Sequence, residues 1–200
     1  MSEPSVLSIK GTAFLLARRD VIALVESGRL SRVALERRLE PADLGFLDDA
    51  PLPTSWYPVA TYDRLLRVLM DIEGGGETGY LVQRARKGME MLMRSGIYKQ
   101  LERAETVARE QGDGWFERTG HILATLPTAF FDKGSWRLSR DEKKKMFTLE
   151  GRGLDGMTAN VAHIVQGAVE FAAEQLIESP VRVTVQRPRD GRVVFVGTHD

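Results

Sequence analysis

The last forty residues carry the clearest pattern of hydrophobic and polar positions. Apolar residues occupy most sides of a helical repeat over residues 157–178, and Pro180 then ends the helix. Valine alternates with polar residues over residues 181–186, Asp190-Gly191 supplies turn chemistry, and a second apolar segment covers residues 193–196. This pattern predicts a buried helix followed by an antiparallel β-hairpin.

The N-terminal quarter of the chain predicts short elements. Residues 8–17 form a mixed apolar run that suits either a strand or the approach to a helix. Asp20 is a good N-cap for a helix with apolar residues at helical spacing, and Ser31 is a good N-cap for a second helix that stops at Pro41. The three prolines within residues 40–55 predict a loop.

The middle of the chain predicts mainly helix. Pro58 suits the first turn of a helix whose apolar stripe runs from Tyr62 to Leu69, and glycines 74–76 end that helix. Three further helices are predicted, over residues 80–93, 97–112 and 115–126.

The repeat then changes to that of short strands. Residues 135–138 and 146–150 predict two strands, and Ser139 and Glu142 have the spacing of a capping box, which predicts one helical turn between them. The predicted fold is α+β: a helical bundle around a long buried C-terminal helix, with a small antiparallel sheet that includes the C-terminal hairpin. One domain covers residues 1–200, with loose tails at residues 1–7 and 198–200.

Composition narrows the classes of function. The 28 basic and 28 acidic residues give no net charge, so electrostatic attraction to nucleic acid is not favoured. The absence of cysteine removes disulfides, thiolate metal sites and cysteine nucleophiles. No secretory signal is visible and no apolar run approaches the roughly 20 residues of a membrane helix. We expect a cytoplasmic protein without membrane insertion.

Known catalytic motifs are also missing from the sequence. There is no Gly-x-Ser-x-Gly, no His-Glu-x-x-His and no pair of carboxylates at a recognisable spacing. The glycine run at residues 74–76 follows a helix and has no lysine after it, so it predicts a helix end and not a phosphate loop. These observations favour a non-enzymatic protein without a metal site.

Apolar and aromatic side chains suggest a ligand cavity, with core packing as the other interpretation. The candidate lining residues are Met89, Phe130, Phe131, Trp136, Ile164, Ala168 and Phe171. His121 and His163 lie on separate predicted helices, without carboxylates at helical spacing. Each is interpreted as a packed or surface side chain, and the alternative is an axial haem ligand, for which a single histidine on a helix suffices.

Three segments carry a resemblance to a known family: Lys10-Gly11-Thr12-Ala13-Phe14, Trp56-Tyr57-Pro58-Val59 and Pro127-x-x-Phe130-Phe131-Asp132. With the closing helix and strands, they resemble a bacterial paralogous family, best known from myxobacteria and of unassigned function. That family looks related to four-vinyl reductase domains, haem-nitric-oxide sensor domains and TRAPP tethering subunits. The resemblance implies helices around a small antiparallel sheet, with an apolar ligand cavity in several members.

The chain departs from these relatives at two points. Haem members use Tyr-x-Ser-x-Arg to hold the propionates, and the nearest segment here, residues 136–140, begins with Trp136. Acylated TRAPP subunits use a cysteine, which this chain lacks. We therefore predict a sensory or protein-interaction module, homodimeric through helices or bound to another protein, that holds a small apolar ligand without a cofactor. The alternatives are a haem-dependent gas sensor and an assembly scaffold without ligand.

Overall fold

The computed structural model describes residues 6–49, 51–94, 123–141 and 143–199. Its first part contains β1 (Ser8–Lys10), α1 (Gly11–Glu26), α2 (Arg32–Glu36), α3 (Pro41–Asp48), β2 (Trp56–Pro58), α4 (Val59–Glu73) and α5 (Thr78–Arg94). Its second part contains the 3-10 helix η1 (Leu126–Ala129), β3 (Ser135–Asp141), β4 (Met146–Leu154), α8 (Ala159–Ile177), β5 (Val181–Arg189) and β6 (Gly191–His199). The predicted α+β class is confirmed.

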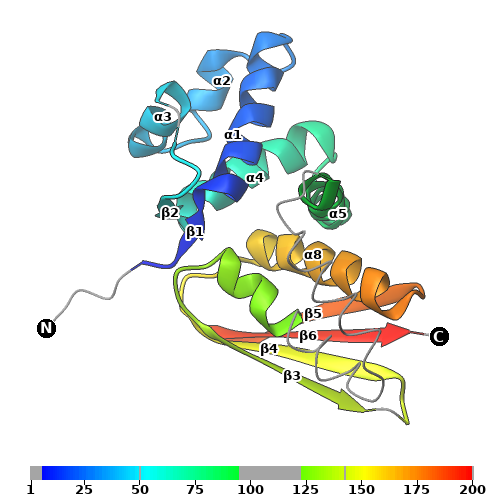
Figure 1. The fold of residues 1–200 in the computed structure, drawn as a ribbon. Helices are drawn as coiled ribbons and strands as arrows, with labels where there is room; N and C mark the ends of the chain where they lie inside the picture. The colour runs from blue at the N-terminus through cyan, green and yellow to red at the C-terminus, as the bar shows by residue number, and fades with distance from the viewer. Residues whose placement is uncertain (1–5, 50, 95–122, 142, 200) are drawn as a thin grey trace, which may run out of the picture.

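The elements stack in layers (Figure 1). The antiparallel strand order is β3-β4-β6-β5, and α8 lies across one face of this sheet. Helix α5 packs on the far side of α8, and α1 to α4 form a separate helical group beside α5. The small β1–β2 pair belongs to that group. Helix α8 is thus placed between the sheet and the N-terminal helices.

None of the described helices is long and apolar enough to cross a membrane.

The face of the sheet beneath α8 forms much of the core. Leu149 on β4 pairs with Phe195 on β6, and both side chains are fully buried. Gly197 pairs with Phe147, where a Cβ atom would lie 2.1 Å from the Phe147 ring. A side chain at position 197 would displace this buried ring, because the ring occupies the space that a Cβ atom would need.

The N-terminal helix differs from the prediction. Helix α1 begins at Gly11, so the prediction that Asp20 is an N-cap is wrong. Asp20 lies within α1, where its carboxylate binds Arg84 of α5. The helix starts early because β1 leads directly into it, with the Gly11 N–H donating to the Ser55 carbonyl at 2.8 Å. The cap at Ser31 is confirmed, since its side chain accepts from the Ala34 N–H.

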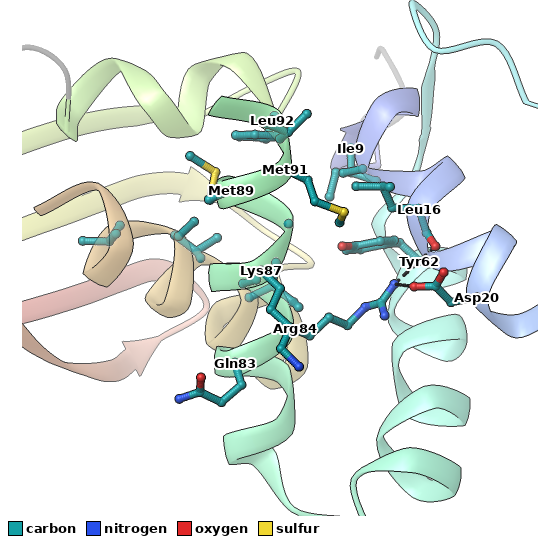
Figure 2. A pocket seen from close by; sticks show the side chains of 18 of the residues that line it. Ile9, Leu16, Asp20, Tyr62, Gln83, Arg84, Lys87, Met89, Met91 and Leu92 are labelled. Carbon is teal, nitrogen blue, oxygen red and sulfur yellow. Dashed lines mark hydrogen bonds and ion pairs between the residues drawn. The ribbon is translucent and has the colours of Figure 1, made fainter. Parts of the chain in front are cut away.

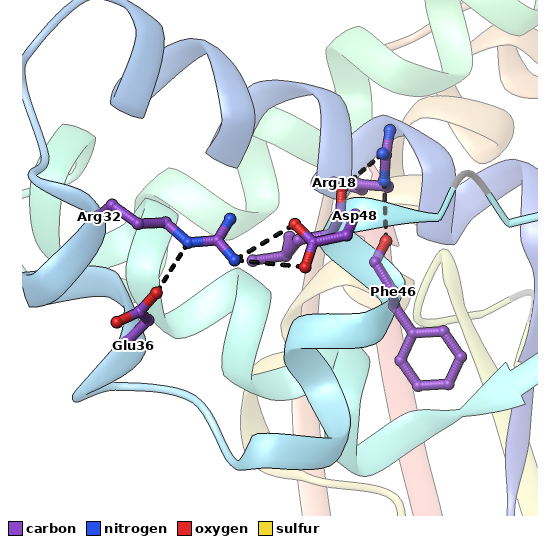
Figure 3. A network of polar contacts seen from close by, with 6 residues as sticks. Arg18, Arg32, Glu36, Phe46 and Asp48 are labelled. Atoms are coloured by element: carbon purple, nitrogen blue, oxygen red, sulfur yellow. Dashed lines mark hydrogen bonds and ion pairs between the residues drawn. The ribbon is translucent and has the colours of Figure 1, made fainter.

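The predicted loop over residues 40–55 contains helix α3 instead. Pro41 occupies its first turn, and the Asp43 carboxylate accepts from the Glu40 N–H at 2.9 Å, which stabilises the helix start. Figure 3 shows how α3 is held at its other end: Arg18 of α1 donates to the Phe46 carbonyl at 2.8 Å. Long-range contacts of this kind leave no periodic signal in the sequence.

Polar contacts also hold α2 against α3. Arg32 donates to Glu36 at 3.0 Å and to Asp48 at 3.2 Å, in the network that Figure 3 draws. These side chains are largely exposed. Solvent screening therefore limits their contribution to stability.

Several predicted boundaries also change. Pro58 belongs to β2 and precedes α4, while α5 spans Thr78–Arg94 instead of residues 80–93. Ser139 lies within β3, so the predicted capping box there is wrong. The helices predicted over 97–112 and 115–126 lie mostly outside the described residues.

Parts of both predicted tails belong to the folded structure. Strand β6 continues to His199, which pairs with Val181, because the hairpin partner strand extends that far. Near the other terminus, Leu7 is buried and its carbonyl accepts from the Val59 N–H. Residues 1–5 lie outside the described residues.

Thr158 ties α8 to the N-terminal helices. Its hydroxyl accepts from the Val161 N–H at 3.2 Å, as an N-cap, and donates to buried Asp63 of α4 at 2.6 Å. We expect Thr158→Val to lower the free energy of unfolding by about 1 kcal/mol, because both contacts disappear while the side-chain shape is kept.

Urea unfolding followed by circular dichroism measures this loss. Thr148→Val is the matched control, since the Thr148 hydroxyl on β4 makes no hydrogen bond to a described residue. Equal midpoints for the two variants would show that the Thr158 hydroxyl does not hold α8 in place.

Candidate functional site

A cavity of about 300 Å³ lies where the N-terminal helices meet α5 and α8. Helix α5 contributes the longest wall, α1 and α4 face it from one side, and α8 faces it from the other. Figure 2 shows side chains from α1, α4 and α5 converging on this space. The cavity therefore has walls from both halves of the chain.

Most of the lining is apolar. The apolar side chains come from β1, α1, α5, the η1 segment and α8: Ile9, Ala13, Leu16, Ala85, Met89, Met91, Leu92, Leu126, Pro127, Phe130, Phe131, Ile164, Val165, Ala168 and Val169. Met91 is 47% exposed, and its flexible thioether points toward Tyr62 in Figure 2. Methionine adapts its shape readily, so this side chain suits a wall that adjusts to an occupant.

A close contact between two helices sets the width of the cavity. Gly167 of α8 faces α5, and a Cβ atom built there would lie 2.2 Å from the Val82 carbonyl oxygen and 2.9 Å from the Ala85 Cβ. Such an approach needs glycine on one of the two helices. The distance between α5 and α8, and therefore between the cavity walls that they carry, depends on Gly167.

One end of the cavity is polar. Arg84 of α5 binds Asp20 of α1 at 2.7 Å and donates to the Leu16 carbonyl at 3.2 Å. Asp20 also binds Arg19 at 2.9 Å. Burial lowers the pKa of Arg84, but the nearby Tyr62 and the Asp20 carboxylate raise it, and the net pKa lies above its usual range. The guanidinium is therefore charged at this end of the cavity.

Two tyrosines line the cavity as protonated phenols. Burial raises the pKa of Tyr62 to about 12, although Arg84 opposes the shift. Burial, together with a hydrogen bond to Glu73, raises the pKa of Tyr80 to about 12. The Tyr80 hydroxyl donates to Glu73 at 2.5 Å, and Glu73 also binds Arg29 at 3.1 Å. Both phenols are hydrogen-bond donors at neutral pH.

The structure brings five of the seven candidate lining residues together. Met89, Phe130, Phe131, Ile164 and Ala168 all line the cavity.

Trp136 and Phe171 are not among the described lining residues. Trp136 lies on β3 with its ring stacked between Phe131 and Phe195, at 6.3 Å between centroids on each side. Its indole nitrogen is buried without a partner in the described structure. Phe171 packs against the core from α8. These two aromatic side chains belong to the packing around the sheet and α8.

The polar end was not predicted from the sequence. Tyr80, Arg84, Lys87 and Met91 share one face of α5, at spacings of three or four residues, and this periodicity is the signal that could have identified them. No periodicity identifies Asp20, because its ion pair with Arg84 depends on how α1 packs against α5.

The described histidines lie outside the cavity lining. His163 on α8 places Nδ1 3.0 Å from Gln166 Oε1, and Gln166 donates to the Val183 carbonyl of β5. His121 lies outside the described residues. Within the described part of the chain, no group of three acidic or histidine side chains could hold a metal ion.

Comparisons with known proteins identify the fold. No protein-family model matches the chain, and no curated protein sequence matches it. The H-NOX protein from K. algicida in its Fe(II) unliganded state is similar in structure, with a TM-score of 0.56, 13% identity and 96% of each chain covered. The Fe(II)NO H-NOX protein from S. oneidensis has a TM-score of 0.56 at 8% identity, covering 96% of this chain and 99% of that one.

A third structure gives the same result. A point mutant of the T. tengcongensis H-NOX protein has a TM-score of 0.53 at 10% identity, with 96% of this chain and 97% of that chain covered. The chain therefore has the fold of H-NOX domains over nearly its whole length. At sequence identities of 8–13%, the similarity shows a shared fold and nothing about function.

The described lining does not fit a haem. Haem iron takes a histidine, cysteine, methionine or tyrosine ligand. Among the described lining residues there is no histidine, and the chain has no cysteine. Tyr62 and Tyr80 are protonated phenols in the absence of a metal, and the Tyr80 hydroxyl already donates to Glu73. The thioethers of Met89 and Met91 also line the cavity, and methionine pairs with a histidine where it holds haem in cytochromes c.

Proposed function

We propose that this chain is a non-enzymatic sensory module whose signal is the occupation of the cavity by a small apolar ligand. The observation that carries the proposal is a cavity of about 300 Å³ whose lining is mainly apolar. This volume is at the lower end of the range for small-molecule sites, about 300–1,000 Å³.

Sensing follows from the position of the cavity. Its walls come from α1 and α4 on one side and α8 on the other, with α5 between them. A ligand that contacts both groups of helices favours the arrangement in which both contacts are made. Binding is therefore expected to change the population of arrangements of the N-terminal helices relative to α8.

Native mass spectrometry and thermal unfolding test the proposal. We expect purified protein to retain, or to bind on addition, a small apolar molecule that stabilises the fold by about 2.7 kcal/mol at a concentration one hundred times its dissociation constant. Ala168→Phe, which places a ring in the cavity, should remove this stabilisation.

Ala60→Phe is the matched control, because Ala60 is exposed on α4. Its ring points into solvent, so ligand binding should be unchanged. If the wild-type protein binds no apolar molecule, and Ala168→Phe alters neither stability nor binding, the cavity is not a ligand site.

Haem is the second candidate ligand, and with it a gas-sensing function. The observation in its favour is the likeness to H-NOX structures, whose names include Fe(II) and Fe(II)NO states. A Soret band on adding hemin, lost in His121→Ala and kept in His163→Ala, would identify haem as the ligand and His121 as its axial residue. The absence of a Soret band would leave the apolar ligand as the only candidate of the two.

We also propose that the module is a cytoplasmic homodimer, associated through its helices, or that it binds another protein in the same way. Light scattering coupled to size-exclusion chromatography measures the mass in solution. An assembly scaffold differs from a sensor in one respect, since its assembly would be unaffected by the apolar ligand.

A further inference from the structure

We propose that the ligand of this cavity is a medium-chain carboxylate, with its apolar tail between α5 and α8 and its carboxylate at the end formed by Tyr62, Arg84 and Lys87. This inference rests on the proposed function, because it specifies the chemical class of the ligand. It is carried by a tyrosine hydroxyl in the cavity lining that has no protein partner among the described residues, and by an excess of positive charge at the same end.

The unpartnered hydroxyl belongs to Tyr62. The residue is only 4% exposed, lines the cavity, and makes no hydrogen bond to any described residue. Figure 2 shows its ring reaching from α4 toward α5, beside Arg84. A hydrogen bond to a charged group contributes roughly 1.5–3 kcal/mol, so a ligand that brings an anionic oxygen to this hydroxyl gains this contact. The hydroxyl is protonated at neutral pH and can donate.

The charges around this hydroxyl favour an anionic acceptor. Arg19 and Arg84 share a single carboxylate, that of Asp20. Glu73, the second acidic residue of the lining, is bound to Arg29 and Tyr80.

Lys87 adds a further positive charge to the lining. It is exposed and forms no ion pair with a described residue. An anion at this end therefore meets more positive than negative charge, in surroundings less polar than water.

The same charges favour a ligand with one negative charge over a ligand with two. Asp20 already binds the Arg84 guanidinium, so an entering anion is placed near one carboxylate. A dianionic phosphate suffers about twice the repulsion of a carboxylate from that group. Tyr62 offers a hydrogen-bond donor to one oxygen of a carboxylate, and Lys87 adds a positive charge to the same lining.

The apolar part of the cavity sets the length of the tail. A volume of about 300 Å³ corresponds to roughly ten groups the size of a water molecule, each about 30 Å³. A methylene group is of similar size. The walls beyond the polar end are apolar, from Ala85 and Met89 on α5 to Ile164 and Ala168 on α8. A chain of about eight to twelve carbons fits this space.

Calorimetric titration with decanoate and with 1-decanol tests the inference. The two molecules have tails of equal length, and only decanoate carries a charge. We expect decanoate to bind the wild-type protein more tightly than decanol does. Tyr62→Phe should weaken the binding of decanoate about tenfold, because a hydrogen bond to a charged group is lost. The same variant should bind decanol less than threefold more weakly than the wild-type protein does.

Lys87→Gln supplies a second variant that leaves the buried residues unchanged. It should weaken decanoate severalfold at low salt and have little effect in high salt. Lys143→Gln is its control, because Lys143 is exposed at the turn between β3 and β4, away from the cavity. It makes the same change of net charge and should leave binding unaltered.

The outcomes separate this inference from the proposed function. If decanol binds as tightly as decanoate and neither Tyr62→Phe nor Lys87→Gln discriminates between them, the carboxylate inference is wrong while the apolar cavity stands. If neither molecule binds at millimolar concentration, and no other apolar molecule does, both proposals are wrong.

Discussion

Replacing Arg64 with methionine is expected to lower the free energy of unfolding by about 3–5 kcal/mol, the usual cost of removing one partner from a buried ion pair. Its partner, Asp43, is only 1% exposed. Arg64 binds both carboxylate oxygens, at 2.5 and 2.8 Å, and thereby joins α4 to α3. Without the guanidinium, the carboxylate still accepts hydrogen bonds from the Glu40 N–H and from Thr61, but no positive charge neutralises it.

The effect of Arg64→Met should depend on pH. Burial raises the pKa of Asp43, but hydrogen bonds from Arg64, Thr61 and the Glu40 backbone outweigh burial and lower it below its usual 3.8. The stability that this depressed pKa gives the wild-type protein is fully present above pH 3.8 and is lost as the pH falls through the folded-state pKa.

In Arg64→Met the pKa of Asp43 is expected to rise, because the hydrogen bond and the charge of Arg64 no longer oppose the effect of burial. The variant is therefore destabilised most at neutral pH, and acid relieves the unpaired charge. The difference from the wild-type protein should shrink as the pH falls toward 4, which urea titrations at several pH values can measure.

Arg32→Met is the matched control. Arg32 also binds two carboxylates, those of Glu36 and Asp48, but in a largely exposed network. Exposed ion pairs contribute about 0–1 kcal/mol, so this variant should unfold near the wild-type midpoint at every pH. Equal losses in Arg32→Met and Arg64→Met would contradict the argument that burial determines the cost.

Features fixed by neighbouring residues could be predicted from the sequence. The stripe from Tyr62 to Leu69 predicts α4 because helical periodicity is a local property, and Gly74 ends that helix as expected. The alternating valines predict β5, and Ser31 caps α2. Part of the apolar lining could be predicted from the same periodicities, since Met89 and Ile164 occupy the inward faces of their helices.

Features that depend on distant residues could not be predicted. Helix α3 was missed because the three prolines within residues 40–55 resemble a loop, while Arg18 and Arg64 stabilise the helix from α1 and α4. The polar end of the cavity depends on the packing of Asp20 against Arg84, residues that are remote in sequence. Trp136 was expected in the lining because an aromatic residue is suited equally to a cavity and to a core.

Gly167→Ala should destabilise the protein by about 2–3 kcal/mol, the upper part of the range for overpacking. In an open helix interior this change would stabilise by nearly 1 kcal/mol, because alanine forms helix better than glycine. At Gly167 the added methyl group would lie 2.2 Å from the Val82 carbonyl oxygen, which belongs to the backbone of α5. A helix backbone cannot rotate away as a side chain does, so α5 and α8 must separate and their apolar contacts weaken.

Gly88→Ala makes the same chemical change on α5, where nothing lies within 4 Å of the added methyl group. It should be stabilising by up to about 1 kcal/mol, so the two variants are expected to shift the urea midpoint in opposite directions. Separation of α5 from α8 would also widen the cavity, and decanol should then bind Gly167→Ala less tightly than the wild-type protein. A shift toward greater stability in both variants would mean that α5 can move aside at little cost, and that Gly167 does not set the width of the cavity.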